Sequence, residues 1–412
     1  MASACKSVVA TIVLLLAMAC SSGSAIPESS TRRAPEVNPV VPLPAATITL
    51  QHSSEWVNDW AQAAKSLRAD QEAWDRFKEA AKREGRVVVS GPGFPGLRNS
   101  LTEGFQRAHG LTLEYLGLAA GEVITRVDRE STAGNVTIDV NLGGVSTCWA
   151  MAERGQVDAI DKLIVDPSLF NPSLWSYGFI RISLPSPSLP SDFYCGLHLT
   201  DWVLADLFVN SDIVKADSLQ SWNALLQPEY KGKIASFDPR RPGSSQGTVG
   251  YLNALFGEQY LRDLYIGQEV TLTADYRQLA EWVARGSYPI GIGLIQTNIE
   301  PLRAEGLPLE RVFPADGPGL LTGGFGVAEK IKGGPNPNAG AVFLNWLASQ
   351  EAQEIWEREL METSLRTDVA HRVPDYVIPK PGADYTFNDY HPGYFFKHRA
   401  QAIERIQDLL GR

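Results

Sequence analysis

Arg86-Val87-Val88-Val89-Ser90-Gly91-Pro92-Gly93-Phe94-Pro95-Gly96 is the stretch that decides the fold. Residues 86–90 contain three consecutive valines, which is typical of a short buried strand. The Gly- and Pro-rich part predicts a turn, the spacing from Leu97 to His109 predicts a helix, and a second strand follows at 111–116. A strand, a helix and a parallel strand form the repeating unit of a sheet covered by helices on both faces.

The same alternation continues along the chain. The sequence predicts further strands at 136–142, 202–209, 233–237, 288–292 and 323–328. It predicts further helices at 123–132, 218–226, 248–256, 276–285, 339–347 and 350–359. Before the first strand, helical spacing runs from Ser53 to Glu84 with Asp70 as a predicted N-cap between two helices. These elements make two α/β halves, followed by a Pro-rich segment and a closing helix from Phe395 to Leu410.

The turn Gly91–Gly96 matches the GxGxxG pattern of dinucleotide-binding proteins, and Glu114 lies where a ribose-binding acid is expected. However, Pro92 and Pro95 have no backbone N–H with which to bind a pyrophosphate. An alternative interpretation needs no dinucleotide: the segment is a strand-to-helix turn whose free amides and helix dipole face a ligand. This interpretation makes Gly93 and Phe94 candidate ligand-binding residues.

Gly243-Ser244-Ser245-Gln246-Gly247 matches GxSxG, the nucleophile turn of α/β-hydrolases. Five residues separate it from the preceding predicted strand, whereas a nucleophile turn follows its strand directly. A secreted hydrolase with Ser245 as nucleophile, and Asp316 with a C-terminal histidine as its partners, is one alternative. A second interpretation makes Ser244 and Ser245 donors to an anion at a helix N-terminus, and a third makes them caps of a helix that begins near Thr248.

The N-terminus predicts export. One early charge (Lys6) precedes an apolar run from Val8 to Ala19, which is too short to span a bilayer and suits a signal peptide. Cys20 follows directly and a Ser/Gly-rich stretch comes next, as in bacterial lipoprotein signals, in which the cysteine is lipidated. An ordinary secretory signal cut near Ala19 or Ala25 is the alternative. We expect residues 1–19 to be a signal peptide and 20–52 a lipid-anchored tether on the outer side of a membrane or in the periplasm.

Composition narrows the function further. The 412-residue chain is 44% hydrophobic and carries a net charge of −10, so it has no basic surface for nucleic acid. The six histidines show no metal-binding spacing, and the sequence predicts no cofactor, no metal ligand and no catalytic residue. In the exported chain Cys148 and Cys195 form an even pair, for which a disulfide and two buried free thiols both remain open.

Seven segments, taken in order, resemble the extracellular solute-binding proteins of ABC importers, in the branch with ferric-iron, phosphonate and polyamine binders. They are Phe77–Val89, Phe105–Gly110, Val127–Gly134 leading to Ile138–Val140, Trp222–Lys233, Gly324–Ala328, Pro335–Ala339 and Phe343–Gln353. The segment Trp222–Lys233 is similar to the family's W-x-x-L-L-x-P-x-x-K-G-K pattern. The resemblance runs from about Phe77 to Asp368, so the N-terminal helix and the C-terminal tail lie outside it.

This resemblance implies an α/β chain with the two-lobed type II periplasmic-binding-protein fold, in which two Rossmann-like lobes are joined by crossing strands near Val203–Val209 and Gly323–Ala328. It implies lobe 1 at 53–207 and 321–370, lobe 2 at 208–320, and a tail with a closing helix at 371–412. It also implies a monomer that is not an enzyme, which closes on a small solute and delivers it to a membrane permease.

The segment after the predicted strand 288–292 bears on the ligand. Ferric-binding relatives carry adjacent tyrosines there, whereas this chain has Gln296 and Thr297, which suit hydrogen bonds to an organic solute. The predicted ligand-binding residues are Gly93, Phe94, Ser146, Trp149, Ser244, Ser245, Gln296 and Thr297. We expect a small organic anion. A ferric-iron or metal-chelate binder is the alternative, and it requires Tyr194, Tyr276 or Tyr288 to converge from elsewhere.

Overall fold

The computed structural model describes residues 54–411 except 205, 206, 318, 380–384 and 386. The predicted signal peptide, tether and lipidated Cys20 lie outside the described residues. Within the described part, no helix has the length and apolar character needed to cross a bilayer.

The first sheet has six strands in the order β2-β1-β3-β13-β5-β4. Its strands are β1 (Arg86–Gly91), β2 (Thr112–Gly117), β3 (Val140–Gly143), β4 (Arg181–Ile182), β5 (Leu197–His198) and β13 (Val327–Lys330). β1 pairs in parallel with both β2 and β3, whereas β13 runs antiparallel to β3 and β5. Val87, Val89 and Val140 are inaccessible to solvent, because helices cover both faces of this sheet.

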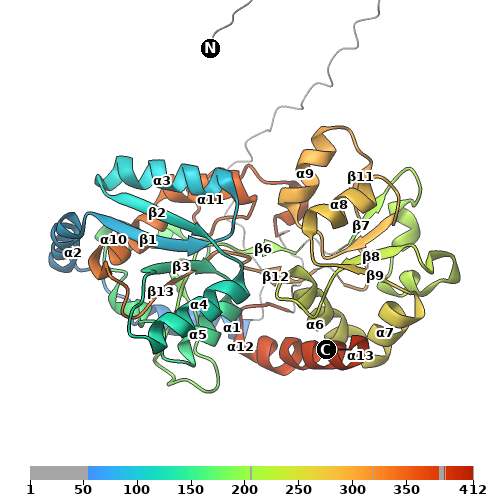
Figure 1. The fold of residues 1–412 in the computed structure, drawn as a ribbon, viewed down its shortest axis with the longest axis horizontal. Helices are drawn as coiled ribbons and strands as arrows, with labels where there is room; N and C mark the ends of the chain where they lie inside the picture. Colours follow the sequence, from blue (N-terminus) through green and yellow to red (C-terminus); the bar gives the residue numbers. More distant parts are fainter. Residues whose placement is uncertain (1–53, 205–206, 318, 380–384, 386, 412) are drawn as a thin grey trace, which may run out of the picture. The chain divides into compact units, whose positions relative to one another are not determined.

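The helices of this half are α1 (Ser54–Ala64), α2 (Gln71–Glu84), α3 (Pro95–His109), α4 (Ala120–Thr132), α5 (Val145–Ala152), α10 (Pro337–Leu347) and α11 (Gln350–Leu360). In Figure 1, α3 and α11 lie on one side of the sheet and α4 and α5 on the other. Asp70 caps α2 as predicted, because its Oδ1 accepts a hydrogen bond from Ala73 N at 2.8 Å.

The second sheet has five strands in the order β11-β7-β10-β8-β9. Its strands are β7 (Leu207–Asn210), β8 (Ile234–Phe237), β9 (Thr271–Thr273), β10 (Ile290–Ile292) and β11 (Leu309–Arg311). Its helices are α6 (Ser244–Phe256), α7 (Glu258–Arg262), α8 (Tyr276–Ala284) and α9 (Gln296–Ala304). Here β8 runs parallel to β9 and β10, so the second half repeats the strand–helix order of the first.

Short helical turns fill the connections. The 3₁₀ turns are η1 (Ile160–Lys162), η2 (Pro167–Leu169), η3 (Pro172–Leu174), η4 (Ala216–Leu219), η5 (Trp222–Leu226), η6 (Pro228–Tyr230) and η8 (Asp375–Val377). The π-helical turns are η7 (Asp263–Gly267) and η9 (Phe395–Arg399). The predicted helix 218–226 is therefore wrong: Ser221 Oγ accepts from Asn223 N and starts a separate 3₁₀ turn there.

Two short strands join the halves. β6 (Trp202–Val203) pairs antiparallel with β12 (Leu321–Thr322). The chain passes from the first sheet to the second through β6 and returns through β12. The predicted return strand 323–328 is divided: Gly323 to Gly326 form a turn, closed by a 2.7 Å hydrogen bond from Gly326 N to Gly323 O, and β13 begins at Val327. The predicted lobe boundaries stay predictions.

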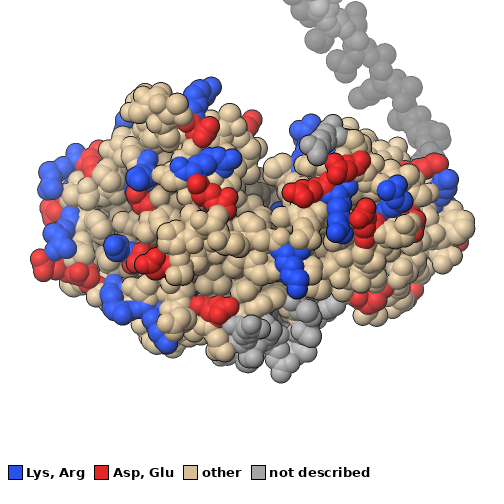
Figure 2. All heavy atoms as spheres, turned by 90° about the horizontal axis from the view of Figure 1, so that it is seen from below, with Lys and Arg blue, Asp and Glu red and all other residues tan. Residues whose placement is uncertain are grey.

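The C-terminus is helical in its last part, as predicted. α12 (Pro392–Tyr394), η9 and α13 (Ala400–Leu410) form one continuous segment, drawn in red along the lower edge of Figure 1 beside α6. Its side chains Tyr394, Ala402 and Ile406 belong to the same apolar cluster as the second sheet. Figure 2 shows acidic and basic side chains interspersed on the face seen from below, which is typical of a solvated surface.

Candidate ligand-binding site

A cavity of about 480 Å³ lies between the two sheets and is lined by residues from both halves. Its walls contain the starts of five helices, α3, α4, α5, α6 and α9, which follow β1, β2, β3, β8 and β10. All five strands belong to the parallel parts of the two sheets. Ligands of α/β sheets bind beyond the carboxyl ends of such strands, where helix N-termini gather.

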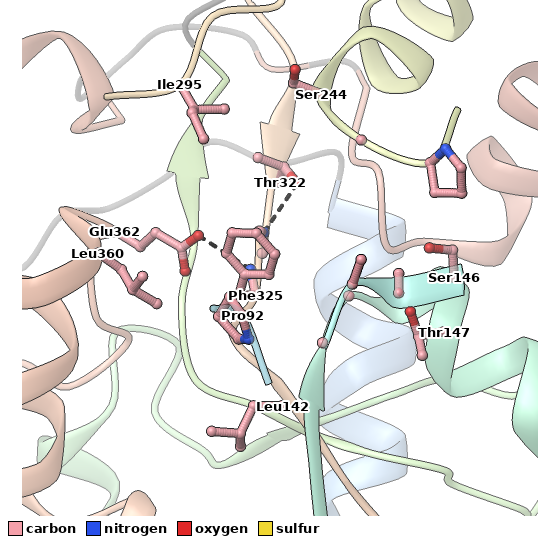
Figure 3. A pocket seen from close by; sticks show the side chains of 18 of the residues that line it. Pro92, Leu142, Ser146, Thr147, Ser244, Ile295, Thr322, Phe325, Leu360 and Glu362 are labelled. Atoms are coloured by element: carbon pink, nitrogen blue, oxygen red, sulfur yellow. Dashed lines mark hydrogen bonds between the residues drawn. The ribbon is translucent and has the colours of Figure 1, made fainter. Parts of the chain in front are cut away.

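Six of the eight predicted ligand-binding residues line this cavity. They are Gly93, Phe94, Ser146, Ser244, Gln296 and Thr297. Figure 3 shows Ser146 and Thr147 projecting from α5 and Ser244 near the start of α6. Phe94 packs edge-on against Phe325, with ring centroids 6.0 Å apart, and gives the cavity an aromatic wall.

The helix starts leave backbone amides without side-chain caps. The N-cap residues of α5, α6 and α9 are Gly144, Gly243 and Ile295, and none of their side chains caps its helix. The amides of a first helical turn have no partner within the helix, and the helix dipole adds partial positive charge there. In α6 one of these amides, Ser244 N, donates to Tyr276 Oη at 3.0 Å.

Trp149 and Ser245 do not line the cavity, so the structure does not bring these two predicted residues to it. Trp149 is 2% exposed, and its Nε1 donates to Leu184 O at 2.8 Å inside the first half. The helix expected from Thr248 begins at Ser244, which puts Ser245 in its first turn with its side chain facing the second sheet. Ser245 is 0% exposed, and its Oγ lies 3.3 Å from Ser236 Oγ.

The structure does not bring together the residues that the hydrolase and dinucleotide alternatives require. Asp316, the acid of the hydrolase alternative, accepts hydrogen bonds from Ser221 Oγ and Trp222 N. No histidine is among the described residues that line the cavity. The acid of the dinucleotide alternative, Glu114, forms an exposed ion pair with Arg86 at 2.8 Å and does not reach the cavity.

Three charged residues in the described part of the cavity wall were missed by the sequence analysis: Glu362, Asp389 and Arg399. Figure 3 shows the Glu362 carboxyl group beside Phe325, whose amide donates to Glu362 Oε1 at 3.1 Å. Trp356 Nε1 donates to Oε2 at 3.0 Å. Burial raises the pKa of Glu362 to about 8, although both hydrogen bonds favour the ionised form. Glu362 is therefore mainly protonated at neutral pH.

The metal alternative required Tyr194, Tyr276 or Tyr288 to reach the site, and one of these three tyrosines does. Tyr194 and Tyr288 do not line the cavity, whereas Tyr276 does. Burial raises the pKa of Tyr276, and its hydroxyl already accepts hydrogen bonds from Ser244 N and Ser244 Oγ. Tyr390 also lines the cavity, but its hydroxyl donates to Asp201. The phenols available to a ferric ion are thus protonated and engaged.

A disulfide fixes the wall formed by α5. Cys148 and Cys195 are bonded, with their Cα atoms 5.9 Å apart, and they tie α5 to the segment that leads into β5. The cysteine pairing left open by the sequence is therefore a bond in the structure. Since Ser146 and Thr147 directly precede Cys148 on α5, the bond holds them at the cavity.

The fold is that of known solute-binding proteins. The periplasmic binding protein AfuA from Actinobacillus pleuropneumoniae, bound to fructose 6-phosphate, has a TM-score of 0.60 at 20% identity, over 79% of this chain and 98% of AfuA. Iron-bound HitA from Pseudomonas aeruginosa has a TM-score of 0.60 at 16% identity, over 79% and 99%. An ABC transporter substrate-binding protein from Agrobacterium tumefaciens has a TM-score of 0.61 at 17% identity, over 79% and 94%.

No curated protein sequence matches the chain. The structural likeness confirms the predicted two-lobed type II fold. A family model described as bacterial extracellular solute-binding protein matches residues 100–376, which is more than half of the chain. The family resemblance seen in the sequence is therefore confirmed, and the chain belongs to the bacterial extracellular solute-binding proteins.

Proposed function

We propose that this chain is the solute-capturing component of an ABC importer, that its cavity holds a small organic anion, and that a membrane permease accepts the solute from it. The observation that carries the proposal is the cavity between the two sheets, with five helix starts in its walls. A solute held there contacts both halves at once, so it favours the closed arrangement by its differential affinity.

The choice of an organic anion rests on the chemistry of the walls. Uncapped amides of α5, α6 and α9 and the hydroxyl of Ser146 offer hydrogen-bond donors. Apolar contacts from Phe94, Leu142 and Phe325 suit the carbon skeleton of a solute more than a bare ion. Glu362 does not repel an anion at neutral pH because it is mainly protonated there. Some relatives bind fructose 6-phosphate and others iron, so the family allows both classes.

Native mass spectrometry of gently purified protein tests the proposal directly. We expect a fraction of the protein to carry an organic anion that is released on denaturation, and we expect small-angle scattering to show compaction when that solute is added back. A stoichiometric metal ion without an organic partner would favour the alternative. A radius of gyration that does not change at saturating solute would contradict closure of the two halves.

Export and anchoring form the second part of the proposal. The apolar run 8–19 and Cys20 support a signal peptide and a lipid anchor that places the folded part outside the cytoplasm. The variant Cys20→Ser should move the protein from the membrane fraction to the soluble fraction. A variant that is processed and bound to the membrane like the wild type would exclude the lipid anchor.

A further inference from the structure

The C-terminal segment (residues 387–411) supplies part of the cavity wall. The family model ends at residue 376, so this segment lies beyond the matched domain. Three of its residues, Asp389, Tyr390 and Arg399, nevertheless line the cavity together with residues from both sheets. Among the described lining residues, Arg399 is the one with a permanent positive charge. The segment therefore adds a cation and its carboxylate partner to described walls that otherwise offer neutral groups and one acid, Glu362.

On one side the segment is seated tightly on α6 of the second half. A Cβ atom placed on Gly250 would lie 2.9 Å from Arg399 Cα and 3.0 Å from Arg399 Cβ. The absence of a side chain at Gly250 thus lets the backbone of the segment touch α6. This contact places the Arg399 backbone beside the middle of α6, and the Arg399 side chain lines the cavity from there.

On the other side the same segment packs on the first half. The rings of Phe395 and Phe396 lie 4.9 Å and 5.0 Å from the indole of Trp149, centroid to centroid. Trp149 is one turn beyond Ser146 on α5. The segment therefore bridges both halves beside the cavity, and its lining residues are held from two directions.

Arg399 is only partly satisfied by the protein. It is 7% exposed, its Nη1 donates to Asp389 Oδ2, and its guanidinium lies 5.2 Å from the ring of Phe395. Its Nε is buried without a hydrogen-bond partner within the described residues, and so is Asp389 Oδ1. A guanidinium has five N–H donors in a planar fork, so one carboxylate leaves donors for a second anion.

Arg399 also lies close to the α6 helix start. Its charge lowers the pKa of Tyr276, which is raised mainly by burial. Tyr276 Oη in turn accepts from Ser244 N at 3.0 Å. A Cβ atom placed on Gly247, in the first turn of α6, would lie 3.8 Å from Asp389 Oδ2, which accepts from Arg399, so this ion pair lies beside the uncapped start of α6. This combination of a fixed cation with helix amides suits a phosphate or carboxylate group.

We propose that the C-terminal segment is a third wall of the solute site, and that Arg399, positioned by Asp389, binds the anionic group of the solute beside the N-terminus of α6. This inference rests on the proposed function, which it deepens by assigning the group that recognises the anion. It goes beyond the matched domain because the residues that carry it come after residue 376.

The test uses inorganic phosphate as the probe and the full-length protein. Thermal unfolding is followed with increasing phosphate at constant ionic strength for the wild type and the variants Arg399→Gln, Arg399→Lys and Arg405→Gln. Arg405 is the matched control, because it is a half-exposed arginine on α13 that pairs with Glu258 at 3.7 Å and does not line the cavity. Gly250→Ala serves as a further variant that displaces the segment without changing a lining side chain.

We expect phosphate to stabilise the wild type and Arg405→Gln equally, with affinity reduced about tenfold or more in Arg399→Gln and less in Arg399→Lys. Gly250→Ala should also lose affinity. A wild type that does not respond to phosphate, or an Arg399→Gln variant that responds like Arg405→Gln, would overturn the proposal.

Native mass spectrometry of the same proteins separates this inference from the proposed function. If wild type and Arg399→Gln retain the same organic solute to the same extent, the inference fails while the proposed function stands. If the wild type retains no solute and closes on none, the proposed function fails. Retention by the wild type and by Arg405→Gln, together with loss from Arg399→Gln, supports both.

Discussion

Two buried arginine–aspartate pairs lie along the C-terminal segment, and they differ in how completely the arginine is enclosed. Arg181 is 0% exposed and donates to Asp201 at 3.1 Å and to Thr200 O at 2.7 Å. Its guanidinium is surrounded by three rings, those of Trp60, Tyr177 and Tyr390, at 4.9, 5.4 and 4.5 Å. Arg399 has one carboxylate and one ring, and it borders the cavity. An enclosed pair holds the fold together, whereas an open pair can take a ligand.

Position in the fold explains the difference. Arg181 lies on β4, where α1 and the C-terminal segment cover the first sheet, so protein groups occupy every direction around it. Arg399 lies where the same segment packs against both halves, and its side chain lines the cavity. The tyrosine that follows Asp389, Tyr390, joins the two regions: its ring lies over Arg181 and its side chain also lines the cavity.

The largest effect is expected from breaking the enclosed pair. Arg181→Gln leaves the Asp201 carboxylate buried without its counter-charge, which typically costs about 3–5 kcal/mol. Arg399→Gln should cost less than half as much, because water in the cavity can solvate Asp389. Urea unfolding of both variants measures the two losses. Equal losses would mean that the open pair is as structural as the enclosed one, and the comparison would fail.

A covalent constraint on the cavity wall should have the next largest effect. The double variant Cys148→Ser with Cys195→Ser removes a bond that closes a loop of 47 residues. Removal of a native disulfide from an exported protein typically costs about 2–5 kcal/mol. Phosphate binding by the protein that remains folded should weaken less than in Arg399→Gln, since Ser146 and Thr147 offer neutral hydroxyls whereas Arg399 carries the positive charge. Titration of the reduced wild type with phosphate is the parallel measurement, and a binding loss as large as that of Arg399→Gln would contradict this ranking.

The third prediction concerns Glu362 and the dependence of the free energy of unfolding on pH. Its pKa is raised from 4.5 to about 8 in the folded protein, so the folded state holds the proton more tightly than the unfolded state. Stability from this group is fully present below about pH 4.5. It falls as pH rises from 4.5 towards 8, while the unfolded chain alone is ionised, and it levels off above 8. We therefore expect the free energy of unfolding of the wild type to decrease between about pH 4.5 and pH 8.

The variant Glu362→Gln removes this titration and keeps a side chain of the same shape. Its free energy of unfolding should therefore depend less on pH between 5 and 8 than that of the wild type. Phosphate affinity of the wild type should also decrease above about pH 8, because an ionised Glu362 repels an anion in the same cavity. Parallel pH profiles for the two proteins would exclude a raised pKa at this position.

Patterns along the sequence could predict the sheets and the site residues that come directly after predicted strands. Gly93, Phe94 and Ser146 follow buried strands. The turn between such a strand and the next helix lies at the ligand-binding edge of the sheet, whichever residue of the turn comes first. Ser245 and Trp149 were misplaced because one residue along a helix turns a side chain by about 100°, and the helix start was predicted four residues late for α6. Sequence spacing does not determine which residue of a first turn faces the ligand.

Glu362, Asp389 and Arg399 carried no local signal. Glu362 follows Met361, which ends α11 in a left-handed conformation. The Glu362 carboxyl group accepts hydrogen bonds from Phe325, which is distant in the sequence, and from Trp356 on α11. Asp389 and Arg399 lie in a tail that matches no family pattern, and they reach the cavity only because Gly250 and Trp149 hold the segment on both halves. Long-range packing of this kind cannot be derived from periodicity.

The smallest expected effect distinguishes two neighbouring serines. Ser244 lines the cavity at the start of α6, whereas Ser245 is inaccessible and its Oγ lies 3.3 Å from Ser236 Oγ. Ser244→Ala removes one hydroxyl near the proposed anion but keeps the amides of α6. One hydrogen bond of this kind contributes about 0.5–1.5 kcal/mol, so phosphate affinity should decrease roughly 2- to 12-fold.

Ser245→Ala should leave phosphate affinity unchanged and alter only the free energy of unfolding, since its partners lie in the second sheet. Calorimetric titration of both variants at one fixed salt concentration makes the measurement. A loss of affinity in Ser245→Ala that equals the loss in Ser244→Ala would show that the α6 start acts through its packing on the sheet, and the anion would then be recognised by Arg399 without help from the serine beside it.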